Sequence, residues 1–540
     1  MGIREMQDLG PMPMNQVPHS SKYIKIPLIV LGGITLAIAI GGGILAMHWP
    51  FAQAKITQSL QETFPATVAF QKFHSTYFPH PGCVAEGVVF TRLGSIPATP
   101  PIVTVQLLTI EAHYIDLLFR RGYLAHIILN GFRVQVPLAG TPLEDTYWHE
   151  IPSATRVGEI VADGAVIEIA RESLRPPLRF DIHTLKMSSV SRDKPLSYAI
   201  SLHNPLPPGE IRAHGQFGPW NSDDPGETPV AGEYTFQNAD LGVFRGIAGI
   251  LSARDEFQGI LQHIETHGSI NIPAFMVTRS EHAVHVTADY HAFVNGTNGD
   301  VHLERVNAAY LKTSVQAKGE IAGHAGQHGK TASLDLTVRD GRIQDVLRLF
   351  VREPKPPLNG VTNFRAHVVI PPDLRPFLHK VRFTADFGIA GGQFAKPSTQ
   401  AKVNTLSERA RGIKPDDDLA DEDQDTVISD LAGHVELRDA TATFSNFSFA
   451  VPGAFAQAHG TYNLESTVVD LHGTLKTDAE LSKMNSGFKS VLLKPFNIFF
   501  QRKHVGAELP VHLIGTYHAP EFGLDLPIKK SADKATAAAN

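Results

Sequence analysis

The chain has 540 residues, a formal net charge of −6 and a pI near 6.5, so it lacks the strongly basic balance that is typical of nucleic-acid-binding proteins. Its single cysteine, Cys83, excludes an intrachain disulfide framework and a cysteine-rich metal site. The length is enough for two or more ordinary domains, or for one elongated domain.

The first 49 residues predict a membrane anchor. Residues 1–25 combine Pro, Met and Gln without periodicity, as in a disordered tail. Residues 26–49 (IPLIVLGGITLAIAIGGGILAMHW) form an uncharged apolar run, and a bilayer core needs about 20 such residues. A cleaved signal peptide is the alternative, but its apolar region is only about 7–15 residues long. Cations precede the run and the next one is Lys55, so the positive-inside rule predicts a single-pass protein with a cytoplasmic N-terminus.

The first part of the exported body predicts a helix followed by a strand–helix–strand pattern. A short helix is expected at 52–64, and a strand at 101–111. A second short helix at 114–121 ends at Gly122, which suits the position after a helix C-terminus. A further strand is expected at 123–136.

Farther along the chain, apolar and polar residues alternate. This period of two indicates strands that have one apolar and one polar face, as in antiparallel sheets wetted on one side. Many such strands build a sandwich, a closed barrel or a long sheet curved into an open trough, and the periodicity does not distinguish these. The alternating segments are 284–294, 333–338, 364–370, 467–475 and 511–517, with a last one near Phe522.

A few segments interrupt the strands. Apolar residues three to four positions apart predict an amphipathic helix, or a broken pair of helices, within 240–267. A shorter helix is expected at 342–351, and helical pieces at 479–503. Residues 393–426 have little apolar content and end in an acidic run, which predicts a disordered linker or loop, and 528–540 are expected to be a frayed tail.

The sequence contains no catalytic signature of the common hydrolase, metalloprotease or nucleotide-binding kinds. The acidic run at 416–425 lacks the Gly and Glu spacing of a calcium-binding EF-hand loop, so a solvated loop is expected. His282, His285 and His291 cluster in sequence, but on one strand they do not all share a face, so no zinc site is predicted. We therefore expect no enzyme activity and no cofactor.

The segment 488–503 mixes aromatic residues with cations, which suits a bilayer interface. The alternative is a helix that caps the end of a sheet while its cations reach water, and this is favoured because Pro495 interrupts any long amphipathic face. The candidate interface residues are Phe496, Phe499, Phe500, Arg502 and Lys503.

This layout resembles the AsmA-like family of bacterial envelope proteins. The anchor is followed directly by a β-rich body, as in that family. Residues 104–137 (TVQLLTIEAHYIDLLFRRGYLAHIILNGFRVQVP) are similar to its N-terminal block, and 431–475 are similar to its C-terminal module. The segments within 481–526 most resemble a shorter, single-anchor branch of the family. The resemblance divides the body into an N-terminal block at 50–140, a middle region at 141–392 that matches only in its β pattern, and a C-terminal module at 427–527.

AsmA-like proteins are similar to bridge-like lipid transfer proteins, in which β units form a long groove. The resemblance therefore implies a mainly β fold, namely an elongated, curved antiparallel sheet with an apolar groove and a few short helices. It implies an inner-membrane protein with its body in the periplasm that binds phospholipid and transfers or shields it; it carries over no catalytic residue. The groove candidates are Val284, Val286, Tyr290, Leu334, Leu336, Val368, Val469, Leu471 and Leu513.

The main alternative is a tethered structural or assembly factor that influences outer-membrane biogenesis without a lipid cargo. That alternative predicts a closed core and protein partners from the envelope. For a groove, about 20 strands at about 4.8 Å spacing give a length on the order of 100 Å, so a partner, an oligomer or a shuttle role is expected.

Overall fold

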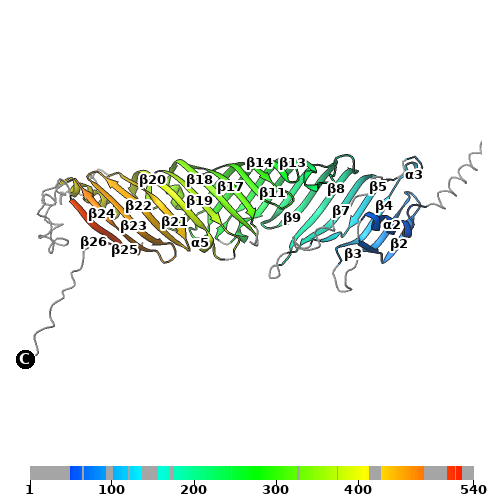
Figure 1. Cartoon of the computed structure of the whole chain (residues 1–540), viewed down its shortest axis with the longest axis horizontal. Coiled ribbons are helices and arrows are strands. Elements are labelled where there is room, and N and C mark those ends of the chain that lie inside the picture. The colour runs from blue at the N-terminus through cyan, green and yellow to red at the C-terminus, as the bar shows by residue number, and fades with distance from the viewer. Residues whose placement is uncertain are drawn as a thin grey trace, which may run out of the picture.

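The structure, a computed structural model, describes residues 49–63, 66–92, 101–119, 122–136, 156–170, 176–244, 246–324, 329–373, 375–412, 427–478, 507–516 and 519–525. These residues build one long curved sheet of 26 strands with few helices (Figure 1). The prediction of a mainly β, antiparallel-rich chain is confirmed.

The N-terminal end of the sheet carries helix α2 and the first strands. Helix α2 packs its apolar side, including Ile56 and Leu60, on a core centred on β3 and β4. Strands β5 and β6 pair antiparallel with β4 and parallel with β7. The elements here are α2 (Gln53–Thr63), β1 (Ala66–Ala69), β2 (Lys72–Thr76), β3 (Gly82–Arg92), β4 (Val103–Glu111), α3 (Tyr114–Phe119), β5 (Tyr123–Asn130), β6 (Arg133–Val136) and β7 (Arg156–Ile169).

The predictions for this end are confirmed, with one refinement. Helices α2 and α3 and strand β4 lie where they were expected, and Gly122 follows α3 with a φ of +81°. The strand expected at 123–136 is divided into β5 and β6, because Gly131 takes a φ of +62°. A side chain is strained in this left-handed region, whereas glycine is not.

Beyond β7 the chain forms a ladder in which each strand pairs antiparallel with the one before it, β12 excepted. The middle strands are β8 (Leu178–Val190), β9 (Leu196–Pro205), β10 (Pro208–Phe217), β11 (Pro229–Asp240), β12 (Ile247–Ala248), β13 (Ile250–Ile260), β14 (His263–Val277), β15 (Val284–Val294), β16 (Val301–Tyr310) and β17 (Thr313–Gly323). The later strands are β18 (Lys330–Arg342), β19 (Leu358–Ile370), β20 (Arg382–Phe394), β21 (Ser429–Arg438), β22 (Thr441–Val451), β23 (Ala454–Asn463), β24 (Val468–Thr477), β25 (Ala507–Thr516) and β26 (Pro520–Leu524). The alternating segments predicted from the sequence fall on these strands, except that Thr467 precedes β24 and residue 517 lies outside the described residues.

Short helices occupy some of the connections. The helix expected at 342–351 is confirmed as α4, which contacts β14, β18 and β19. The helices are η2 (Pro225–Glu227), η3 (Leu241–Val243), α4 (Ile343–Phe350), α5 (Phe377–Lys380) and α6 (Pro397–Ala410).

The helix predicted within 240–267 is wrong, because this segment forms η3, β12, β13 and the start of β14. Gly242, Gly246, Gly249 and Gly259 lie within it, and each glycine costs a helix about 1 kcal/mol relative to alanine. The apolar spacing that suggested a helix runs through the turn at 261–262, where the alternation changes phase. Pairing with β11 and β15 then decides the conformation.

The prediction of a disordered linker at 393–426 is wrong for its first half, where Pro397–Ala410 form helix α6. Helix α6 is held by Gln400, whose side-chain carbonyl accepts from the Phe394 N–H at 2.8 Å and whose amide donates to Asn404 and to the Val427 carbonyl. Val403 and Leu406 pack it against the core of β22 to β25. The acidic run lies outside the described residues.

The curvature of the sheet has a local cause. Register shifts of the β-bulge kind interrupt most pairs from β11 to β22, and bulges bend strands and increase their twist. Glycines at the bends allow the backbones of neighbouring strands to approach each other closely. A Cβ on Gly319 would lie 2.1 Å from the Ser333 carbonyl oxygen, and Gly319 has a φ of +148°.

Several predicted segments lie outside the described residues: the tail at 1–25, the anchor up to residue 48, the helical pieces at 479–503 and the tail at 528–540. In the part of the chain that the structure describes, no helix is both long enough and apolar enough to cross a membrane.

Candidate functional site

The strand register gathers apolar side chains on one face of the sheet, here called the apolar face. In antiparallel sheets, directly opposed residues project to the same side. Tyr290 opposes Gly268 on one neighbouring strand and Val306 on the other. Leu334 opposes Val368, and the same relation continues strand by strand to β26. All nine predicted groove residues therefore lie on this face: Val284, Val286, Tyr290, Leu334, Leu336, Val368, Val469, Leu471 and Leu513.

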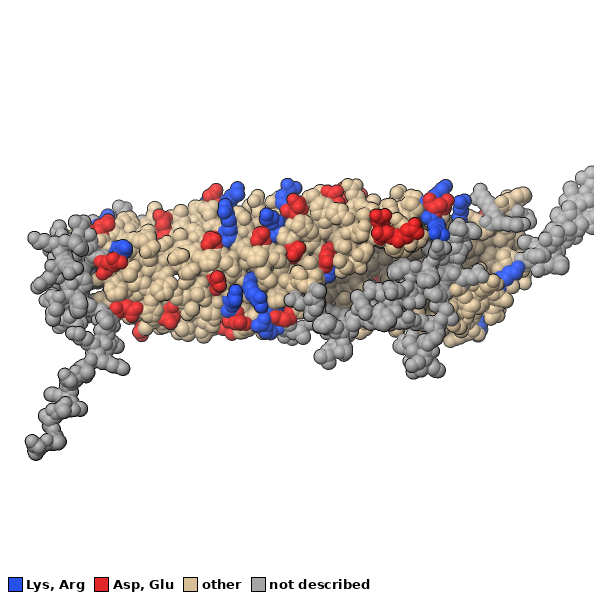
Figure 2. All heavy atoms as spheres, viewed as in Figure 1, with Lys and Arg blue, Asp and Glu red and all other residues tan. Residues whose placement is uncertain are grey.

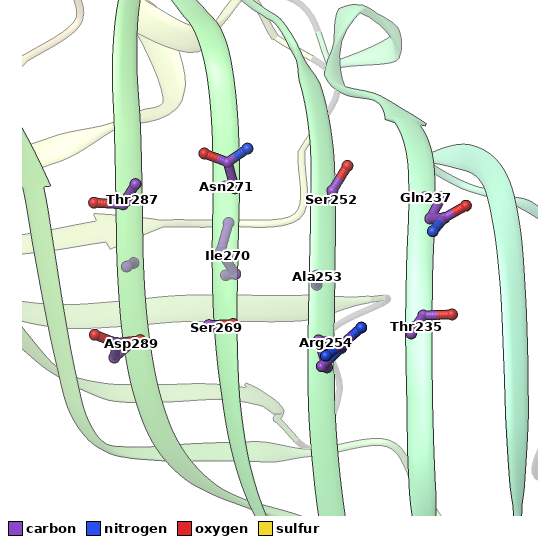
Figure 3. A pocket seen from close by; sticks show the side chains of 11 residues that line it. Thr235, Gln237, Ser252, Ala253, Arg254, Ser269, Ile270, Asn271, Thr287 and Asp289 are labelled. Atoms are coloured by element: carbon purple, nitrogen blue, oxygen red, sulfur yellow. The ribbon is translucent and has the colours of Figure 1, made fainter.

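The opposite face, here called the outer face, is polar. One of its rows runs across neighbouring strands as Thr235, Arg254, Ser269 and Asp289. Figure 3 shows this row and a second one beside it, with polar side chains on all four strands. Lysine, arginine, aspartate and glutamate side chains are scattered along the visible side of the molecule (Figure 2).

The apolar face is the concave one. Val338, Ala292 and Ala385 are 1%, 2% and 3% exposed, although the sheet is a single layer through most of its length. A single layer buries one of its faces only if it curls around that face, so that the side chains on it pack against each other. The apolar face therefore lines the inside of a curled sheet.

The two rims of the curled sheet meet in its middle. The guanidinium of Arg279, between β14 and β15, donates to the Leu464 carbonyl, between β23 and β24. A Cβ on Gly246 would lie 3.2 Å from the Cβ of Phe377 in α5, which is likewise on the opposite rim. A sheet that meets itself after about nine strands has a bore close to that of closed sheets of about eight strands, which hold packed side chains or one small ligand.

A polar cluster interrupts the apolar face between β11 and β15. Asp255 is only 2% exposed, and its carboxylate accepts hydrogen bonds from the hydroxyls of Thr266 and Tyr290. The Tyr234 hydroxyl lies 3.3 Å from that of Tyr290. Away from the strand ends, Asp255 is the single charged residue that the register places on the apolar face among the described residues of β7 to β26.

The chemistry of this cluster follows from its burial. Burial raises the pKa of the Tyr290 hydroxyl, and the adjacent Tyr234 and Asp255 raise it further. Burial likewise raises the pKa of Tyr234, so both hydroxyls stay protonated and able to donate. Gly268 leaves the room for this arrangement, since a Cβ there would lie 2.5 Å from the Tyr290 hydroxyl. A carboxylate solvated by neutral hydroxyls is costly to bury, and a polar group of a bound molecule would reduce that cost.

Sequence reasoning found Tyr290 in this cluster but missed Asp255. Asp255 stands in the segment that was interpreted as a helix, where a charged residue is unremarkable. Once the segment is known to be a strand, the position of Asp255 between Ala253 and Phe257 on the apolar face is the signal that identifies it.

His282, His285 and His291, which cluster in the sequence, each have a different partner in the structure. His282 lies 3.0 Å from the Glu353 carbonyl, His285 lies 2.7 Å from the Asn271 side-chain oxygen, and His291 lies 3.0 Å from Glu265. The structure adds His267, which sequence reasoning did not consider, to the neighbourhood of His291. The Glu265, His267 and His291 ligand atoms all lie within 4.8 Å of one another.

A shallow depression of about 430 Å³ lies on the outer face of β11 to β15. Eight of its lining residues are polar, and the other three, Ala253, Ile270 and Ala288, project to the apolar face. It is therefore not a site for an acyl chain. The predicted interface residues Phe496, Phe499, Phe500, Arg502 and Lys503 lie outside the described residues.

No family model, no curated protein and no solved structure matches this chain.

Proposed function

We propose that the chain is an AsmA-like protein that binds phospholipid along the apolar face and transfers or shields it in the bacterial periplasm. In this proposal residues 26–49 anchor the protein in the inner membrane. The observation that carries the proposal is the continuity of the apolar face from β7 to β26, with one charged residue away from the strand ends. An apolar lining that continues over so many strands, broken only at the Asp255 cluster, exceeds what a small packed core needs, and it suits long acyl chains.

The energetics favour acyl chains as the cargo. Moving a methylene from water to an apolar lining contributes about 0.8 kcal/mol. One strand spacing of about 4.8 Å matches about four methylenes of an extended chain. Each strand that a tail crosses therefore stabilises it by about 3 kcal/mol, and a full-length tail is held by about four neighbouring strands.

The test is site-specific photo-crosslinking in intact cells. A benzophenone amino acid placed at Leu336, on the apolar face, should capture phospholipid, which mass spectrometry of the purified protein would identify. The matched control is Thr337, the next residue of β18, which lies on the outer face. Capture of lipid at Leu336 and not at Thr337 supports the proposal. Absence of a lipid adduct at Leu336, or equal adducts at both positions, contradicts it.

The second candidate function is the tethered structural factor without lipid cargo. The burial of Val338, Ala292 and Ala385 favours it, because these side chains are covered without any bound molecule. This candidate predicts protein adducts from outer-face positions and no lipid adduct from Leu336. The same crosslinking experiment therefore separates the two functions.

A further inference from the structure

Large apolar side chains are exposed together at the N-terminal end of the sheet. Phe78 is 89% exposed and Phe119 is 80% exposed. Ile115 and Phe119 are four residues apart on α3 and so share one side of it. The Tyr114 hydroxyl donates to the Tyr77 carbonyl and ties α3 to the loop between β2 and β3. We call this set the aromatic patch: Tyr77, Phe78, Tyr114, Ile115 and Phe119.

The patch lies where the apolar N-terminal run joins the body. Trp49, the last residue of that run, is buried, with its ring centroid 4.7 Å from that of Tyr77 and 5.8 Å from that of Phe51. Helices α2 and α3 lie at the same end of the elongated molecule (Figure 1). Because Trp49 contacts Tyr77, an anchor at 26–49 would place the patch beside the point where the chain enters the bilayer.

We propose that the aromatic patch inserts into the interfacial layer of the phospholipid bilayer and seats the N-terminal end of the sheet on the membrane. This inference rests on the proposed function, because it takes 26–49 as the anchor. Aromatic side chains favour the level of the lipid head groups, and exposed apolar groups gain free energy there by leaving water. In the sequence Phe119 is followed by Arg120 and Arg121, which suits anionic phospholipid.

The protein offers a clean way to test this. Its only cysteine, Cys83, is fully buried, and burial raises the pKa of its thiol to about 12, so it resists labelling. A nitroxide can then be attached to Phe78→Cys or Phe119→Cys in the full chain, reconstituted in phospholipid nanodiscs. The matched control is Val468→Cys, which is 45% exposed on the outer face of β24, near the opposite end of the sheet.

The readout is the accessibility of the nitroxide to oxygen, which concentrates in lipid, and to a water-soluble nickel chelate. We expect labels at 78 and 119 to favour oxygen and the label at 468 to favour the chelate. Equal preference for the chelate at all three sites overturns the inference. So does a label at 78 or 119 that is immobile and shielded from both reagents, because a protein partner then covers the patch.

These outcomes are distinguishable from failure of the proposed function. If the labels at 78 and 119 report water while Leu336 still captures phospholipid, the seating fails and lipid binding stands. If the labels report lipid while Leu336 captures none, the end of the sheet is seated on the membrane but carries no lipid.

A second inference comes independently from the outer face. On β14 and β15, His267 and His291 are directly opposed, and their rings stack with centroids 4.2 Å apart. The Glu265 carboxylate lies 3.3 Å from His267 Nε2 and 3.0 Å from His291 Nε2. We infer that these three residues bind one divalent transition-metal ion of the zinc type. Two imidazoles and a carboxylate are a ligand set that zinc accepts, with a fourth position left for water.

The neighbouring charges do not oppose this inference. Glu256 opposes His267 and Arg305 opposes His291, so one acid and one base flank the site. Titration of the full chain in detergent with zinc, against a chromogenic chelator, should show one binding equivalent that His267→Ala removes. His285→Ala, on the same face of β15 and bonded to Asn271, is the matched control and should keep it. An equal number of tight equivalents in wild type and His267→Ala overturns the inference.

Discussion

Val368 and Val369 are adjacent on β19 and project to opposite faces. Val368 opposes Leu334 and Phe383 on the apolar face, whereas Val369 opposes Ser333 and Arg382 on the outer face. Both side chains are half-buried. The same substitution, valine to aspartate, can be made at both positions. Any difference between the two variants therefore depends on the face of the sheet and not on the type of substitution.

The expected magnitude follows from the strand spacing. A carboxylate at position 368 removes the contact of a tail with about one strand, which is about four methylenes at about 4.8 Å per strand. At about 0.8 kcal/mol per methylene the loss is about 3 kcal/mol, or about a 200-fold weaker Kd. Aspartate at 369 stands beside Arg382 and in water, so a change of less than about threefold is expected.

The assay is exchange of bound phospholipid for a fluorescent phospholipid in the purified full chain, with the thermal midpoint measured in parallel. Aspartate is disfavoured in strands by up to about 1 kcal/mol in both variants, and the larger loss of stability is expected in Val368→Asp, whose carboxylate faces an apolar surface. Wild-type affinity in Val368→Asp would refute the assignment of the apolar face. An equal loss in Val369→Asp would show that strand distortion, and not the face, governs binding.

Three further outcomes follow from the structure. Gly319→Ala should destabilise the sheet by about 1–3 kcal/mol in chemical denaturation, because the φ of Gly319 is +148° and a Cβ there would lie 2.1 Å from a carbonyl oxygen. Gly388 has open space around it, so Gly388→Ala should cause no such loss. Tyr290→Phe removes a donor to the buried carboxylate and should lower stability by about 1–3 kcal/mol in the same measurement. The pKa of His472 is raised above 6.5, chiefly by its hydrogen bond to Asp525. The contribution of this pair to stability is therefore present below pH 6.5 and is lost as the pH rises through the raised pKa. Histidine hydrogen exchange followed by mass spectrometry should show the His472 pKa falling in Asp525→Asn; an unchanged pKa would contradict this pairing.

Much of the apolar face could be predicted from the sequence. The direction of a side chain on a strand alternates from residue to residue, and this alternation is visible within a few positions of sequence. Val284, Leu336 and Val469 were therefore assigned correctly to the apolar sides of their strands without knowledge of the strand partners. Helix α4 was likewise predictable because its apolar residues lie on one side of a single short segment.

The segment at 240–267 shows where this local reasoning fails. Its apolar spacing fits a helix, yet its hydrogen bonds are made with β11 and β15, and those partners outweigh a helical preference that glycine already weakens. Helix α6 was missed for a related reason. It has little apolar content of its own, and it is held by Gln400 and by contacts with strands that follow it in the chain.

The sequence by itself determined a mainly β chain with a single apolar face, because that property is repeated within each strand. Only the tertiary structure decided that Asp255 meets Tyr290 and Tyr234, that Glu265 and His267 meet His291, and that the rims meet at Arg279. Each of these depends on the register between strands and on how far the sheet curls. Register and curl are set by how separate strands pair and by the bulges in those pairs, so the alternation within one strand does not encode them.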